Sequence, residues 1–137
     1  MSVEIDIASL ANALQEAAAV EILPRFRNLG EGDVRVKTEA IDLVTEADEA
    51  AERLIRARVA EFMPDALFVG EEAVAADPSL LEKIGDADLA VIVDPIDGTF
   101  NFASGLPLFG VMLSVVSKGE TIAGLIYDPM GNDWVIA

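Results

Sequence analysis

The segment VIVDPIDGTFNF, residues 91–102, is the most informative part of the sequence about the fold. Its apolar start is typical of a buried strand, and the run ends in two aspartates, Asp94 and Asp97, three positions apart. Pro95 fixes the backbone direction between them, and Gly98 permits a tight turn. The segment raises the question of why a buried strand would end in two carboxylates that point the same way.

Each acid also has a purely structural interpretation. Asp97 can act as the N-cap of a helix that begins in the sequence DGT. Upstream, the run FVGEEA at residues 68–73 also passes from apolar residues to acids. Glu71 and Glu72, taken alone, are most simply explained as two solvated loop residues.

The structural interpretation weakens when the two apolar runs are taken together. If they form neighbouring strands of one sheet, their ends place Glu71, Asp94 and Asp97 at one edge. Carboxylates at close range repel one another and become partly protonated unless a cation lies among them. A divalent cation with hard oxygen ligands explains such a cluster, and the carbonyl of Ile96 can add a neutral ligand. Backbone N–H groups at the following helix start can bind an anion, so the pattern favours a phosphate site.

The composition limits the chemistry further. The 137 residues include no cysteine and no histidine, which excludes disulfides, thiolate zinc sites and serine–histidine triads. Any metal must be held by oxygen, which favours magnesium, manganese or calcium. The net charge of −16 argues against a nucleic-acid partner. The N-terminus lacks the pattern of a signal peptide and no apolar run is long enough to span a bilayer, so we expect a cytoplasmic protein without a membrane partner.

Hydrophobic periodicity predicts two helices in the first half of the chain. An amphipathic helix is expected over residues 5–23, and Pro24 is expected to kink or end it. A second helix is expected over residues 45–63, with Thr45 as N-cap and Asp48 in a capping-box position. Its outer face is expected to carry two i,i+4 pairs, which are Glu49–Arg53 and Glu52–Arg56.

The rest of the chain is predicted to form mainly strands. Alternating or apolar runs predict strands at residues 34–37, 66–70, 89–94, 109–117, 121–127 and from 134 onward, with a short helix at 79–84. The predicted fold is α+β and forms one domain over residues 1–137. Two N-terminal helices pack on a largely antiparallel sheet in this fold.

Three motifs resemble one known family. GEE at 70–72, DPIDGT at 94–99 with NF just after it, and DLVTEAD at 42–48 are similar in order and spacing to the inositol monophosphatase family of magnesium-dependent phosphatases. The resemblance runs from about Ile5 to Ala137 and implies a layered α/β sandwich. Family members are about twice as long, so the C-terminal α/β half is expected to be absent here. We expect that half to cover an open sheet edge and the apolar face behind it.

The resemblance implies a set of metal ligands. Glu71, Asp94 and the Ile96 carbonyl would bind a first Mg²⁺, and Asp94 would bridge to a second Mg²⁺ that Asp97 also binds. Glu71 would in addition touch a third, weaker ion. The complete enzyme would thus hold two or three Mg²⁺ ions, for which Mn²⁺ or Ca²⁺ can substitute.

The resemblance also implies roles in catalysis and phosphate binding. Glu71 and Thr99 would act on the attacking water, with Asp48 hydrogen-bonded to Thr99, and the amides of Gly98 and Thr99 would hold the phosphate. Glu72 would lie behind the metal ligands, and Lys37 would lie near the site. An exposed lysine on an edge strand is an equally simple explanation of Lys37.

Two departures from the family pattern stand out. Phe100 occupies a position where many members have a second threonine, and we expect it to pack inward. The tryptophan–aspartate motif of the family's second half, which completes the second metal site, is absent. Trp134 follows Asp133 in a different region.

The function implied is a Mg²⁺-dependent phosphomonoesterase that acts through a metal-activated water on a small polyol phosphate. Inositol monophosphate is the first candidate, and histidinol phosphate, fructose bisphosphate and phosphoadenosine phosphate are alternatives of the same chemistry. Lithium inhibition and a homodimer are further implications. An alternative of another class is a non-catalytic module for dimerisation or partner binding. A structural calcium domain is disfavoured because the EF-hand spacing of acids is absent.

Overall fold

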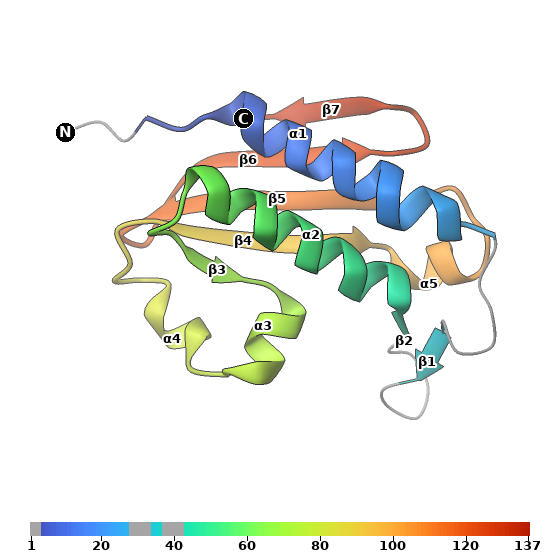
Figure 1. Cartoon of the computed structure of the whole chain (residues 1–137), viewed down its shortest axis with the longest axis horizontal. Coiled ribbons are helices and arrows are strands. Elements are labelled where there is room, and N and C mark those ends of the chain that lie inside the picture. Colours follow the sequence, from blue (N-terminus) through green and yellow to red (C-terminus); the bar gives the residue numbers. More distant parts are fainter. Residues whose placement is uncertain (1–3, 28–33, 37–42) are drawn as a thin grey trace.

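A single five-stranded sheet carries two long helices across one face (Figure 1). The computed structural model describes residues 4–27, 34–36 and 43–137. The sheet has the order β3-β4-β5-β6-β7, with β3 at Leu67–Val69, β4 at Ala90–Asp97, β5 at Gly110–Ser117, β6 at Glu120–Asp128 and β7 at Asp133–Ile136. A separate antiparallel pair is formed by β1 (Val34–Val36) and β2 (Leu43–Thr45).

The first helix, α1 (Ile7–Ala17), begins at an N-cap that the sequence analysis missed. Asp6 accepts the backbone N–H of Ser9 at 3.0 Å and its hydroxyl at 2.6 Å, which satisfies a free donor of the first turn. The chain continues as a π-helical turn η1 (Ala18–Ile22) and a 3-10 turn η2 (Leu23–Arg25) that contains Pro24. The predicted helix is confirmed, but the helical segment runs from Ile7 to Arg25 instead of 5–23, and its part after Ala17 is not α-helical.

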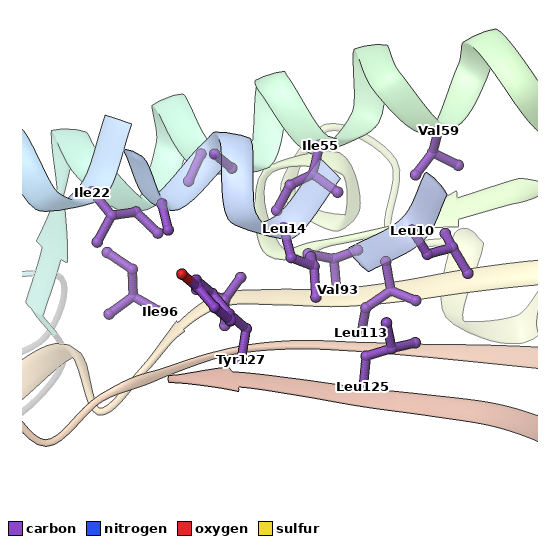
Figure 2. Packing of buried hydrophobic residues seen from close by; sticks show 14 of the residues in the cluster. Leu10, Leu14, Ile22, Ile55, Val59, Val93, Ile96, Leu113, Leu125 and Tyr127 are labelled. Carbon is purple, nitrogen blue, oxygen red and sulfur yellow. The ribbon is translucent and has the colours of Figure 1, made fainter. Parts of the chain in front are cut away.

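The second helix, α2 (Glu46–Phe62), lies beside α1, and together they bury one face of the sheet. Figure 2 shows side chains of both helices pointing at the sheet and meeting side chains of β4, β5 and β6. Residues in this core include Leu10, Leu14, Ile22, Ile55, Val59, Val93, Leu113, Leu125 and Tyr127. A bidentate contact from Arg58 to Glu16, with both N···O distances at 2.8 Å, joins the two helices at their outer side.

The sheet is largely antiparallel, as predicted, with one exception that matters for the site. β3 runs parallel to β4, with Val69 opposite Ile92, while the other neighbouring pairs are antiparallel. The β3–β4 connection contains α3 (Glu71–Ala76) and α4 (Leu80–Lys83), and α5 (Thr99–Ala103) follows β4. The helix at α3 was not predicted. Because β3 and β4 are parallel, both strands end at the same edge of the sheet.

The two faces of the sheet differ in what covers them. Leu125 is 1% exposed beneath the helices, whereas its neighbour Ile126 is 47% exposed on the opposite face, where Val135 is 65% exposed. That opposite face holds an open hollow of about 370 Å³ lined by residues of β4, β5, β6 and β7, including Asp94 and Met112. Within the described ranges, no helix is both long enough and apolar enough to cross a bilayer.

Candidate functional site

A β-bulge in β4 brings Asp94 and Asp97 to the same side. Asp94 lies opposite Met112 and Asp97 lies opposite Gly110, so three steps along β4 correspond to two steps along β5. In a regular strand, residues three apart point to opposite faces, but one extra residue reverses the alternation. Both aspartates are therefore exposed, while the two residues between them are buried. This bulge is how a buried strand ends in two carboxylates with a common direction.

The electrostatics of this pair favour a bound cation. Partial burial and, secondly, the charge of Asp97 raise the pKa of Asp94, against a hydrogen bond from the Ile96 backbone that lowers it. Burial takes water away from the Asp94 carboxylate, and the charge of Asp97 repels it, so both effects disfavour its ionised form. A hard divalent cation bound by oxygen would supply that charge, so the donor set fits Mg²⁺ or a similar ion.

The turn after β4 requires a glycine. Gly98 has φ +93° and precedes the first residue of α5, and a Cβ at this position would lie 2.9 Å from the carbonyl oxygen of Leu108. Gly98 occupies the N-cap position of α5 and makes no side-chain hydrogen bond there, so the alternative structural interpretation of Asp97 as this N-cap is wrong. The Thr99 hydroxyl donates to the carbonyl of Ile96 at 3.1 Å, which connects two of the predicted site residues.

Glu71 leaves the sheet at the same edge as Asp94. In the parallel β3–β4 pairing, Val69 lies opposite Ile92. Glu71 comes two residues after Val69, and Asp94 comes two residues after Ile92, so the two acids lie at the same level. The condition posed from the sequence, that these two strands are neighbours, is met. Glu71 and Glu72 are exposed, but they form the first turn of α3 rather than a loop.

Asp48 lies in the first turn of α2 and is buried. Figure 1 shows this end of α2 on the side of the sheet where β3 and β4 end, and β2, which leads directly into α2, contacts α5. Thr45 precedes α2 as an N-cap would, but its side chain is not among those described, and Lys37 also lies outside the described residues.

Phe100 is 61% exposed, so the expectation that it packs inward is wrong.

The acids at this edge do not close into a larger cluster. Within residues 4–27, 34–36 and 43–137, no three acidic side chains lie close enough together to hold a metal ion as a group. The bulge brings Asp94 and Asp97 together, and β3 delivers Glu71 to the same end of the sheet.

A buried acid, Glu52, lies beside the site and was not predicted from the sequence to be buried. Glu52 was expected on the outer face of α2 as a partner of Arg56, but it is only 3% exposed and contacts the start of α3. Helical spacing could have predicted this burial. Glu52 lies four residues after Asp48 and three before Ile55, which places it on the inner side of α2. Arg56 instead lies over the ring of Phe68, 5.7 Å from its centroid.

The fold and the site match one family of known proteins. The sequence profile of the inositol monophosphatase family matches residues 5–137. The fructose-1,6-bisphosphatase/inositol-1-monophosphatase of Thermotoga maritima is 38% identical over 105 residues, which are 77% of this chain and 38% of that protein. The Nus factor SuhB of Pasteurella multocida is 37% identical over 92 residues, 67% of this chain and 32% of that protein.

The structural comparison agrees with these relatives. The solved structure of the Thermotoga maritima IMPase superposes with a TM-score of 0.80 and 30% sequence identity, covering 97% of this chain and 48% of that one. This chain therefore spans less than half the length of the relatives it matches. Because the family profile covers nearly all of its residues, the chain belongs to the inositol monophosphatase family.

Proposed function

We propose that this chain forms part of a Mg²⁺-dependent phosphomonoesterase that hydrolyses a small phosphorylated polyol, with inositol monophosphate as the first candidate substrate. The observation that carries the proposal is the bulge in β4, which directs Asp94 and Asp97 to one side beside the strand that delivers Glu71. Membership of the inositol monophosphatase family supports the same reaction class.

The chain's oxygen atoms would hold the metal. Asp94 and Asp97 would supply carboxylate ligands, Glu71 a further carboxylate, and Ile96 its backbone carbonyl, which keeps a lone pair while it accepts from Thr99. When bound, Mg²⁺ would offset negative charge on the phosphoryl oxygens and lower the pKa of a water molecule. Mn²⁺ or Ca²⁺ would compete for the same oxygen ligands.

The turn after β4 would position the substrate and the water. Gly98, the N-cap residue of α5, makes no side-chain hydrogen bond to the first turn, and we assign the backbone N–H groups of Gly98 and Thr99 to the phosphate oxygens. The Thr99 oxygen retains acceptor capacity and would orient the water. Asp48, buried at the start of α2, would support Thr99.

A second candidate is a non-catalytic binding role on the same scaffold. It is favoured by the names of relatives such as the Nus factor SuhB of Pasteurella multocida, which do not describe a phosphatase. Under this proposal the carboxylate pair could still bind a cation, but no phosphate ester would be turned over.

The test is phosphate release by the complete protein that contains this chain, from inositol monophosphate and from fructose 1,6-bisphosphate, each with Mg²⁺ and with a chelator. We expect release only with Mg²⁺, and a loss of about 100-fold or more in Asp97→Asn, because electrostatic stabilisation would be removed from the transition state. Asp86→Asn, an exposed turn acid, is the control. Equal release with chelator, or by Asp97→Asn, would refute the mechanism, and metal binding without release would favour the second candidate.

A further inference from the structure

We infer that Glu52 is a positioning residue that fixes the start of α3 and thereby the backbone of Glu71. The inference rests on the proposed function in one respect, namely that Glu71 is taken as a metal ligand. The placement of Glu52 itself rests on its contacts with Gly70, Glu72 and Ala73.

The start of α3 has no local cap. Gly70 stands at the N-cap position and carries no side chain that could accept a hydrogen bond from the first turn. α3 has only six residues, and a helix this short has little stability of its own in water. Its first turn therefore depends on an acceptor from elsewhere in the chain.

Glu52 provides that acceptor from α2. One carboxylate oxygen accepts the backbone N–H of Glu72 at 3.0 Å, and the other accepts the backbone N–H of Ala73 at 3.0 Å. The negative charge also suits the positive end of the helix dipole. Hydrogen bonds from N–H groups to a carboxylate are stronger than those between neutral groups, and this carboxylate is buried from solvent.

Gly70 completes the arrangement by leaving space. Its φ of −143° and ψ of 172° are extended values that any residue adopts, so backbone conformation does not require glycine here. A Cβ at this position would lie 2.5 Å from Cδ of Glu52 and 2.6 Å from one of its carboxylate oxygens. The glycine thus allows the carboxylate to approach the chain directly before Glu71.

Glu71 is consequently held on both sides. The residue before it packs against the Glu52 carboxylate, and the residue after it donates its N–H to the same carboxylate. The direction of the Glu71 side chain is then set by a backbone anchored in α2, which is itself packed on β4. A group that orients a metal ligand without touching the metal typically changes metal affinity by about 10- to 100-fold when it is replaced.

The test compares Glu52→Gln and Gly70→Ala with the parent chain. The glutamine side chain offers one acceptor and turns an amide group toward the second N–H donor, while a methyl group at position 70 displaces the carboxylate. Amide hydrogen exchange measured by NMR without metal reports on the start of α3, and calorimetry with Mg²⁺ reports on the ligand. We expect faster exchange concentrated at Glu72 and Ala73 in both variants, and Mg²⁺ affinity lowered by roughly 10-fold or more.

Two controls separate positioning from general stability. Arg53→Ala removes the exposed ion pair of Arg53 with Glu72, 3.3 Å long, but leaves both backbone hydrogen bonds in place. Leu125→Ala weakens the core away from α3. We expect Mg²⁺ affinity to stay within about twofold of the parent in both controls, because neither removes an acceptor at the start of α3.

The outcomes distinguish this inference from the proposed function. The inference would be overturned if Glu52→Gln melted at a lower temperature than the parent but bound Mg²⁺ with the same affinity. Glu52 would then contribute to stability alone. If the parent itself binds no Mg²⁺, the proposed function fails for this chain. Amide hydrogen exchange then tests by itself whether Glu52 fixes the start of α3. Faster exchange confined to the start of α3 would then support it, and unchanged or uniformly faster exchange would refute it.

Discussion

Asp94 and Asp97 lie three residues apart in β4 yet point to the same side of the strand, because a one-residue bulge separates them. Partial burial and the neighbouring charge raise the pKa of Asp94, so the pair is unfavourable in the folded chain without a cation. A costly arrangement of this kind is typical of a functional site rather than of a feature kept for stability.

The first prediction concerns stability without metal. Asp94→Asn should raise the melting temperature in the presence of chelator by roughly 1–3 °C, since it removes a partly buried charge that repels Asp97. Differential scanning calorimetry at neutral pH measures the change. Asp86→Asn should have no comparable effect, and an Asp94→Asn variant that melts lower than the parent would contradict this interpretation of the pair.

The second prediction tests the turn that follows β4. Gly98→Ala should cost about 2 kcal/mol or more, because alanine at positive φ is strained and its Cβ would approach the Leu108 carbonyl. Gly124→Ala in β6 is the matched control, since a Cβ there meets no atom within 4 Å and glycine weakens a strand. Chemical denaturation gives both values. Similar costs at the two positions would argue against a special backbone at Gly98.

The third prediction uses two neighbours that face opposite sides of the sheet. Leu125→Ala should cost about 2–5 kcal/mol, because it opens a cavity in the core beneath the helices. Ile126→Ala should cost less than about 1 kcal/mol, since Ile126 is already half-exposed. Urea unfolding of the two variants checks the pair. A large decrease in the free energy of unfolding of Ile126→Ala would contradict the exposure of Ile126 in the structure.

The fourth prediction concerns pH. The bidentate contact from Arg58 lowers the pKa of Glu16, mainly through the hydrogen bond. A lowered folded-state pKa contributes stability above the unfolded value, which is about 4.3, and this contribution is lost as pH falls through the folded value. Glu16→Gln should therefore melt slightly below the parent at pH 7, and the difference should shrink as pH falls through the folded-state pKa of Glu16 and vanish below it.

Thermal melts over that pH range check the prediction, with Glu120→Gln as an exposed control on another element. The effect should be small, because both side chains of the pair are partly exposed to solvent. A difference between the variant and the parent that persisted unchanged at low pH would show that Glu16 acts through packing rather than through its charge.

Much of the fold could be predicted because the long elements carry strong periodicity. The stripes of α1 and α2 and the apolar run of β4 were sufficient to predict two helices on a largely antiparallel sheet. The parallel pairing of β3 and β4 could be posed only as a condition, since strand order is not encoded locally. That pairing confirms that Glu71 and Asp94 leave the sheet at one end.

Three features escaped prediction for physical reasons. The helix α3 is six residues long, and its cap comes from Glu52, twenty residues earlier, so no local start signal precedes it. The bulge in β4 depends on pairing with β5, and neither Pro95 nor its neighbours specify it alone. Glu52 was placed outward because charged residues are usually exposed, a tendency that a tertiary contact overrides.

The most direct test of the central claim is a calorimetric Mg²⁺ titration of the parent chain beside Asp94→Asn and Asp86→Asn. If the carboxylate pair on the bulge is a metal site, the parent and Asp86→Asn should bind Mg²⁺ at millimolar or lower concentration, and binding should weaken by about 10-fold or more in Asp94→Asn. Equal binding by the parent and Asp94→Asn, or no binding by the parent at millimolar Mg²⁺, would contradict the claim.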